Sequence, residues 1–189
     1  MAKTAFIFVA NGTEETEAVG TLDTLRRGGV DAHFVSIYKE KEITSAHGLK
    51  IIADYSIDEV KSNMVDAIVL PGGMPGATNL YESEALRDMI SRHYEAGKYI
   101  AAMCASPLVF GRMGLLEGKK ATAYPGFESE LKGAKYMAMP AVVDGHIITG
   151  RGPGYVFNFG AAILGELEGY EKAYDVAEGL LITEELEEE

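Results

Sequence analysis

The 189-residue chain contains a single cysteine, Cys104, and therefore cannot form a disulfide within itself. Its 17 basic residues are outnumbered by 29 acidic ones, which gives a formal net charge of −12 at pH 7. An acidic chain without a basic block is poorly suited to phosphate backbones, so we expect no nucleic-acid partner. No apolar run approaches the length of a membrane span, and residues 4–10 are too short for a signal-peptide core. We therefore expect a soluble, cytoplasmic protein that does not bind membranes.

Sequence patterns for metals and nucleotides are also missing. The four histidines are scattered, with no HxxxH pair and no companion cysteines, and this predicts that no metal is bound. His93 falls on an apolar helical stripe, which favours a core or helix-surface position. The glycine-rich segments PGGMPG (71–76) and GRGPG (150–154) match neither the phosphate-binding loop nor the dinucleotide fingerprint. We expect no cofactor.

Short apolar runs rich in β-branched residues alternate with segments of helical periodicity. Strands are expected at 4–10, 32–37, 66–71, 98–103 and 146–150, and helices at 15–27, 83–96, 157–168 and 170–182. This alternation predicts an α/β fold whose largely parallel sheet is covered by helices on both faces.

Two stretches depart from the alternation of strands and helices. Residues 42–54 have the pattern of a hairpin, and residues 121–149 have that of short strands with a tight turn at Asp144-Gly145. At 47% hydrophobic and without an obvious linker, residues 1–183 are expected to form one domain. The acidic residues 184–189 are expected to be a solvated tail.

Ligands of open parallel sheets bind beyond the carboxyl ends of the strands, where Cys104 and both glycine-rich segments are expected. A cysteine at a sharp strand-to-helix turn receives backbone N–H groups and the helix dipole, which would lower its pKa. The alternative is a small buried core residue. The PGGMPG segment is either an ordinary turn or a source of N–H groups for an oxyanion, and GRGPG is interpreted as mainly architectural.

Three acidic residues, Glu14, Glu15 and Glu17, begin the first expected helix. Acids are favoured in a first helical turn whatever the protein does. Helical spacing from Ala18 and Leu22 predicts that Glu14 or Glu15, rather than Glu17, faces inward.

The segments AFIFVANGTEETEAVGTLDTLRRGGV, DAIVLPGGMPGATNL, IAAMCASP and GRGPGYVFNFGAAIL together resemble the ThiJ/PfpI superfamily. Within it they are most similar to the branch of the parkinsonism-associated protein, whose members are described as deglycases or glyoxalases. The resemblance implies a flavodoxin-like three-layer α/β sandwich, related to the class I glutamine amidotransferase-like fold. It also implies a homodimer with the cysteine on a nucleophile elbow.

The resemblance further assigns site residues. It places Glu17, not its neighbours, against Cys104, where a protonated carboxyl would donate a hydrogen bond to the sulfur and stabilise a thiolate or a sulfinate. It gives the backbone N–H groups of Gly73 and Ala105 as oxyanion donors. Arg27 corresponds to an arginine near the dimer contact.

Several positions differ from the family patterns. Ala105 stands where the protease-like branch has a histidine, which argues against a Cys-His peptidase. Tyr124 occupies the place of a histidine near the cysteine, and His47 that of an arginine reaching across the dimer. Ser106 is the small residue two positions after the cysteine, and Gly72 is a further expected site neighbour.

The function expected from these residues is a stress-protective enzyme. Its Cys104 thiolate would act on a small-molecule 2-oxoaldehyde such as methylglyoxal, or on glycated adducts, with Glu17 transferring protons. A second hypothesis is a redox sensor or chaperone that works through oxidation of the same thiol. A third is a cysteine peptidase-like hydrolase, by analogy of fold alone.

Overall fold

The computed structural model describes residues 2–182, and the expected acidic tail at 184–189 lies outside them. The strands of the main sheet are β1 (Thr4–Val9), β2 (Asp31–Ser36), β5 (Tyr55–Ser56), β6 (Ala67–Leu70), β7 (Tyr99–Met103), β10 (Ala141–Asp144) and β11 (Ile147–Gly150). Their order is β10-β11-β7-β6-β1-β2-β5. Neighbouring strands are parallel except β10 and β11, which pair antiparallel at one edge. The predicted, largely parallel sheet is confirmed.

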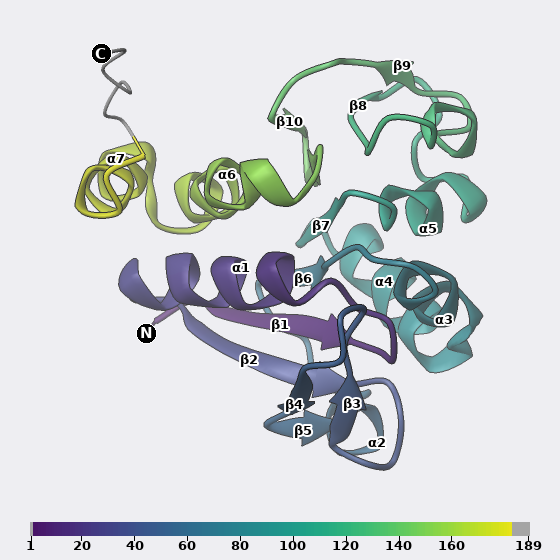
Figure 1. Cartoon of the computed structure of the whole chain (residues 1–189). Helices are drawn as coiled ribbons and strands as arrows, with labels where there is room; N and C mark the ends of the chain where they lie inside the picture. Colours follow the sequence, from purple (N-terminus) through teal and green to yellow (C-terminus); the bar gives the residue numbers. More distant parts are fainter. Residues whose placement is uncertain (1, 183–189) are drawn as a thin grey trace.

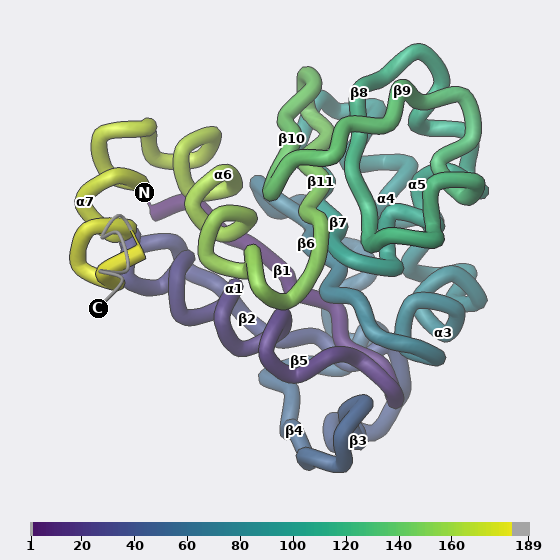
Figure 2. Tube along the Cα trace, turned by 45° about the horizontal axis from the view of Figure 1, so that its top comes forward, coloured from purple at the N-terminus to yellow at the C-terminus, as the bar shows by residue number. Residues whose placement is uncertain are grey.

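Helices cover both faces of this sheet (Figure 1). One face carries α1 (Glu15–Arg27), α6 (Val156–Glu168) and α7 (Tyr170–Gly179). The other carries α2 (Ile57–Val60), α3 (Gly76–Glu82), α4 (Glu84–Glu95) and α5 (Pro107–Arg112). Figure 2 shows α6 beside α7 and near α1, and α6 contacts both. The three-layer α/β sandwich expected from the sequence is therefore confirmed.

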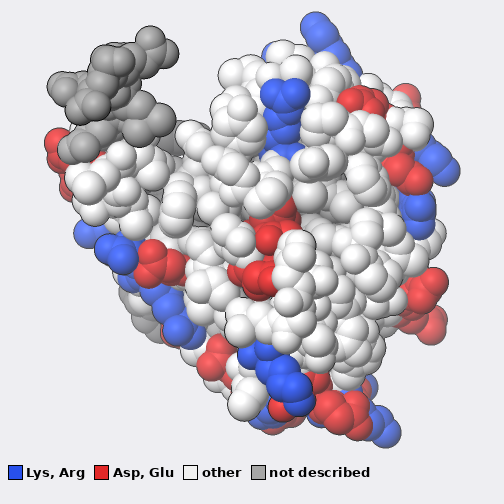
Figure 3. Space-filling view, in the orientation of Figure 1, with Lys and Arg blue, Asp and Glu red and all other residues white. Residues whose placement is uncertain are grey.

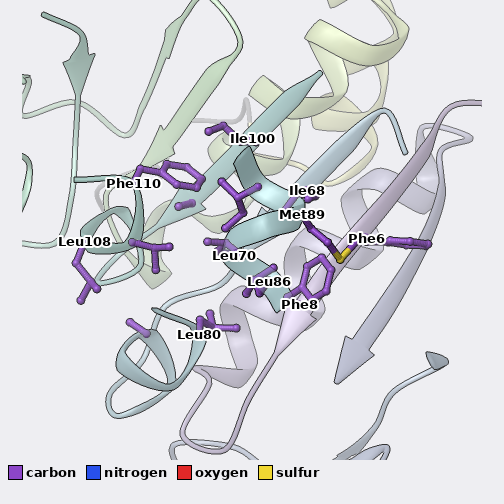
Figure 4. Packing of buried hydrophobic residues seen from close by; sticks show 14 of the residues in the cluster. Phe6, Phe8, Ile68, Leu70, Leu80, Leu86, Met89, Ile100, Leu108 and Phe110 are labelled. Atoms are coloured by element: carbon purple, nitrogen blue, oxygen red, sulfur yellow. The ribbon is translucent and has the colours of Figure 1, made fainter. Parts of the chain in front are cut away.

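Strand β1 illustrates why the sheet needs a helical layer on each side. Successive side chains of a strand point to opposite faces. Phe6 and Phe8 join the core beneath α3, α4 and α5, part of which is drawn in Figure 4. Ile7 and Val9 join the core beneath α1 and α6, and all four side chains are buried. Because both faces are covered, the strand sequence is continuously apolar rather than alternating.

The two irregular stretches form small sheets and turns. Strands β3 (Glu42–Thr44) and β4 (Lys50–Ile52) make the expected antiparallel hairpin. Strand β8 (Lys120–Ala121) pairs in parallel with β9 (Lys135–Tyr136), and short 3-10 turns occupy Glu128–Glu130 and Pro153–Tyr155. The tight turn predicted at Asp144-Gly145 joins β10 to β11, with Gly145 at a φ of 63°.

The last helix is shorter than its sequence pattern predicted. It was expected over 170–182 but ends at Gly179. Leu181 has a φ of 59°, in the left-handed region, so the backbone leaves the helical path there. Across residues 2–182, none of the helices has both the length and the apolar character needed to cross a bilayer.

Candidate active site

Cys104 lies immediately after β7, where the chain turns toward α5. Its φ is 62°, in the left-handed region that non-glycine residues rarely adopt. Its N–H donates to the Gly150 carbonyl and its own carbonyl accepts from the Tyr124 N–H, both at 2.9 Å. The Ser106 N–H donates to the Met103 carbonyl across the turn at 3.0 Å. A strained residue fixed in this way at a strand end has the geometry of a nucleophile elbow.

Glu17, in the first turn of α1, brings a carboxyl group to the Cys104 sulfur. The side chain is completely buried. Its Oε2 accepts a hydrogen bond from the Gly72 N–H at 2.7 Å, and the carboxyl group hydrogen-bonds with the thiol. The prediction from helical spacing, which turned Glu14 or Glu15 inward instead, is wrong.

The spacing argument failed because α1 buries more than one stripe of side chains. Ala18 and Leu25 join the core against the sheet. Glu17 and Thr24 are also buried, and Thr24 packs so tightly on α6 that a Cβ at Gly160 would lie 2.8 Å from it. A helix enclosed by both a sheet and a second helix buries a wider arc than one periodic stripe.

The glycine loop after β6 packs its backbone against both the acid and the thiol. A Cβ at Gly72 would lie 2.5 Å from the Cβ of Cys104 and 2.7 Å from Oε2 of Glu17, so only glycine fits there. The Gly72 carbonyl accepts a hydrogen bond from the Glu14 N–H at 2.9 Å, which ties this loop to the start of α1. Gly73 has a φ of 90°, a conformation that favours glycine.

Two backbone donors point at the sulfur. The N–H groups of Gly73 and Ala105 both hydrogen-bond to Cys104. Donors placed here can stabilise negative charge on the sulfur, or on an oxygen bonded to the carbon that the sulfur attacks.

The acid and the thiol influence each other's titration. Burial raises the pKa of Glu17 to about 7. Burial, the charge of Glu17 and the hydrogen bond that the thiol donates to Glu17 raise the pKa of Cys104 to about 12, against the lowering effect of the Gly73 and Ala105 N–H groups. The expectation that Cys104 has a lowered pKa is therefore wrong, because burial and Glu17 outweigh the backbone donors of the turn.

The physical reason is that burial and Glu17 raise the pKa of Cys104, while α5 does little to lower it. Helix α5 has only six residues and begins at Pro107, beyond the turn. A buried carboxylate disfavours a second negative charge beside it. As the pH rises through about 7 the pair therefore gains one negative charge, held by Glu17, and the sulfur becomes a thiolate when Glu17 takes its proton.

Ser106 and Tyr124 support the elbow from different directions. The Ser106 hydroxyl donates to the Pro71 carbonyl at 2.5 Å and so links the elbow to the glycine loop. The Tyr124 ring is 46% exposed and lies against Gly152, where a Cβ would be 3.0 Å from the ring. This ring lines a cavity of about 330 Å³ together with Arg151 and its neighbours.

His47 and Arg27 are not brought to the thiol within one chain. His47 is largely exposed, and its Nδ1 lies 3.2 Å from Oε1 of Glu15. Arg27 pairs with Asp23 at 2.7 Å in the last turn of α1, about 15 Å along the helix axis from Glu17. Their expected positions near a dimer contact stay predictions.

A cation could be held by Glu14, Glu15 and His47, whose ligand atoms lie within 4.8 Å of one another. Figure 3 shows acidic side chains, in red, gathered at the centre of the molecular surface that faces the viewer, near the start of α1. The three side chains already have protein partners, because Glu14 accepts the Glu17 N–H at 2.6 Å and Glu15 pairs with His47. The expectation that no metal is bound stays a prediction.

A larger cavity of about 650 Å³ lies at the opposite edge of the sheet. It is lined by Thr4, Asp31 and Asp66, which stand at the amino ends of β1, β2 and β6. Because Cys104 lies at the carboxyl end of β7, this cavity is not part of the cysteine site.

The model of the DJ-1/PfpI family matches residues 3–166. The chain belongs to the DJ-1/PfpI family. It is 40% identical over 183 residues to "Protein DJ-1 homolog A" of Arabidopsis thaliana, covering 95% of this chain and 47% of that protein. It thus spans less than half the length of this plant relative.

Two further family members match along almost their whole length. The "Glutathione-independent glyoxalase DJR-1.2" of Caenorhabditis elegans is 31% identical over 170 residues, covering 89% of this chain and 90% of that protein. The solved structure "Toxoplasma gondii DJ-1, oxidized" superposes with a TM-score of 0.92 at 36% identity, covering 95% of this chain and 98% of the other. The family resemblance inferred from the motifs is confirmed.

Proposed function

We propose that the protein is a cysteine-dependent enzyme that acts on 2-oxoaldehydes such as methylglyoxal, or on the glycated adducts they form. The observation that carries the proposal is the buried Glu17–Cys104 pair, in which the pKa of Glu17 is raised to about 7. A carboxyl group that titrates near neutral pH is well matched to taking up and returning protons. The glyoxalase activity named for the nematode relative supports this class of reaction.

In the first step the sulfur of Cys104 adds to the aldehyde carbon, and a carbon–sulfur bond forms. The Glu17 carboxylate accepts the thiol proton during the attack, so the nucleophile needs no permanently ionised state. The aldehyde oxygen becomes negative and is stabilised by the N–H groups of Gly73 and Ala105 before it receives the proton from Glu17.

In the second step Glu17 moves a proton between the two carbons of the former dicarbonyl. It removes the hydrogen, as a proton, from the carbon bound to sulfur and returns it to the neighbouring carbon, while the hydroxyl proton of the first carbon passes to the ketone oxygen. The first carbon is thereby oxidised to a thioester, while the neighbouring ketone is reduced to an alcohol. Water then hydrolyses the thioester, which releases lactate when the substrate is methylglyoxal and restores the thiol of Cys104.

The redox alternative relies on the same groups, since the donors of Gly73, Ala105 and a protonated Glu17 would also stabilise a sulfinate. The Toxoplasma relative was solved in a form described as oxidized. We favour the enzyme because a carboxyl group with a pKa near 7 serves proton transfer, which storage of an oxidised sulfur does not require.

Incubating the purified protein with methylglyoxal and following lactate tests the proposal. Turnover should rise as the pH increases through about 7, because Glu17 must lose its proton to act as the base. Cys104→Ser should reduce lactate formation to the uncatalysed background, while Lys172→Gln, an exposed change on α7, should keep it. A Cys104→Ser variant as active as the wild type would exclude the mechanism.

A further inference from the structure

We infer that the cavity beside Cys104 binds a carboxylate, and that the preferred substrates are 2-oxoaldehyde adducts whose carrier bears one. This inference rests on the proposed function and narrows its substrate class. The cavity measures about 330 Å³, and its walls include Tyr124, Arg151, Pro153 and Tyr155. The sequence pattern had assigned the GRGPG segment a mainly architectural role.

The cavity and the nucleophile share the same backbone supports. On one side, the Tyr124 N–H donates to the carbonyl of Cys104 at 2.9 Å. On the other, the N–H of Cys104 donates to the Gly150 carbonyl at 2.9 Å, and Arg151 is the next residue. The segments that form the cavity thus adjoin the backbone of Cys104 on two sides, and the proposed substrate, carried on the sulfur, extends into it.

The charge of Arg151 is not neutralised by the described part of the protein. Arg151 as a residue is half-buried, and its guanidinium forms no ion pair or hydrogen bond with any side chain or carbonyl in residues 2–182. The side chains of the other five arginines each have a partner. Three pair with carboxylates: Arg26 with Asp54, Arg27 with Asp23 and Arg112 with Glu130. Two donate to backbone carbonyls: Arg87 to that of Tyr81 and Arg92 to that of Lys61. An unpaired guanidinium in a chain of net charge −12 is suited to a carboxylate, which matches its planar fork of N–H donors.

The size and lining of the cavity favour a substrate larger than methylglyoxal. Cavities of roughly 300–1,000 Å³ accommodate whole small-molecule ligands, and methylglyoxal would leave most of this one unfilled. Tyr124 and Tyr155 are 46% and 39% exposed, and together with Pro153 they offer flat apolar surfaces for the body of a carrier. An amino-acid-sized carrier with a free carboxylate meets both requirements.

The chemistry of such a substrate leads into the mechanism already proposed. A thiol carrier adds to methylglyoxal to give a hemithioacetal. Cys104 then displaces the carrier: its sulfur bonds to the former aldehyde carbon, and the bond from that carbon to the carrier sulfur breaks. The thiol proton of Cys104 passes through Glu17 to the departing carrier sulfur. The carrier leaves unchanged, and the enzyme-bound hemithioacetal continues to lactate.

The test compares two substrates, the methylglyoxal hemithioacetals of N-acetylcysteine and of N-acetylcysteinamide. The first carrier has a carboxylate, and the second has a neutral amide in its place. The wild-type kcat/KM should favour the carboxylate substrate by about tenfold or more, mainly through KM, because charge-assisted hydrogen bonds are about twice as strong as neutral ones. Arg151→Gln should reduce this ratio to near one, and Arg151→Lys should give an intermediate ratio. Lys172→Gln removes the same charge from exposed α7 and should keep the wild-type ratio. Unchanged melting temperatures would show that the variants are folded.

Equal wild-type kcat/KM for the two substrates, with lactate still produced, would overturn the inference and leave the proposed function standing. Absence of turnover for both adducts and for methylglyoxal would instead reject the proposed function. In that case the cavity is tested by NMR titration with N-acetylalanine and N-acetylalaninamide, which contain no reactive aldehyde. Binding of the carboxylate alone, lost in Arg151→Gln, would support the carboxylate site, whereas binding of neither would overturn it.

Discussion

At the scale of single residues, the chemistry depends on how one proton is divided between Glu17 and Cys104. Both groups are buried and in contact; the Glu17 carboxylate opposes a charge on Cys104, whereas the hydrogen bond from the thiol favours the charge on Glu17. The Gly73 and Ala105 N–H groups favour charge on the sulfur, and the Gly72 N–H favours it on the carboxylate. Because the pKa of Cys104 is about 12 and that of Glu17 about 7, the proton rests on the sulfur and passes to Glu17 only as the sulfur attacks.

Replacing Glu17 by Gln should make the thiol easier to ionise and the enzyme less active. The substitution removes the charge and hydrogen bond that raise the pKa of Cys104, while burial and the backbone donors remain. The midpoint of pH-dependent alkylation by iodoacetamide, followed by mass spectrometry, should fall below that of the wild type. Methylglyoxal turnover should decrease by roughly 10²–10⁴-fold because the proton acceptor is lost.

Glu15→Gln provides the matched control, since Glu15 is the nearby acid that pairs with His47 rather than with the thiol. It should leave the alkylation midpoint in place. A midpoint in Glu17→Gln at or above the wild-type value would mean that Glu17 acts mainly as a protonated donor that stabilises the thiolate, as the family resemblance implies.

At the scale of secondary-structure elements, helix α4 is joined to the loop before β6 by a buried histidine. His93 is fully buried, its Nε2 accepts the Val65 N–H at 3.1 Å, and its Nδ1 lies 2.7 Å from the Met89 carbonyl. These partners require a neutral ring that donates from Nδ1. Burial lowers the pKa of His93, because the charged ring would be desolvated.

The fold should lose stability as the pH falls below about 6.5, the ordinary pKa of an unfolded histidine. The unfolded chain then binds a proton that folded His93 resists, at a slope of up to about 1.4 kcal/mol per pH unit. His93→Gln should flatten this dependence, because an amide can accept from Val65 and donate to Met89 without titrating. Urea unfolding midpoints at pH 7.5 and 5 measure the effect.

His47→Gln is the control for this measurement, since His47 is largely exposed. It should retain most of the wild-type decrease in stability at low pH. A His93→Gln variant with the full wild-type decrease would show that other groups cause the acid sensitivity.

At the scale of the whole molecule, the described surface includes apolar side chains on two neighbouring elements. Val19 on α1 is 45% exposed, and Leu49 and Ile52 at the β3–β4 hairpin are 51% and 74% exposed. The hairpin lies against the start of α1, where the Ala46 N–H donates to the Thr13 carbonyl at 2.8 Å. Exposed apolar surface of this kind is typical of a region that contacts another protein.

The homodimer implied by the family resemblance stays a prediction, and this surface gives a way to test it. Sedimentation should give twice the chain mass of 20.4 kDa, and Ile52→Glu should shift the protein toward the monomer by placing a charge on the apolar surface. Met64→Glu, at a 46% exposed side chain beside the amino-edge cavity, is the control that should remain dimeric. A monomeric wild type at all concentrations would contradict the prediction.

The sequence by itself determined the α/β fold, the helices α1, α4 and α6, and the position of Cys104 at a strand end. These features follow from local periodicity and from the rule that parallel strands place their carboxyl ends together. The family motifs also named Glu17 as the partner of Cys104. Periodicity alone missed it, because α1 is buried by both the sheet and α6.

Only the tertiary structure decided the protonation of the site and the cavity beside it. The pKa values of Glu17 and Cys104 depend on burial and on backbone donors from two separate loops. The cavity is lined by two segments, one containing Tyr124 and the other containing Arg151 and Tyr155. These segments are distant in the sequence and adjacent in the fold. Desolvation and long-range contacts leave no local pattern in a sequence, so they could be read only from the folded chain.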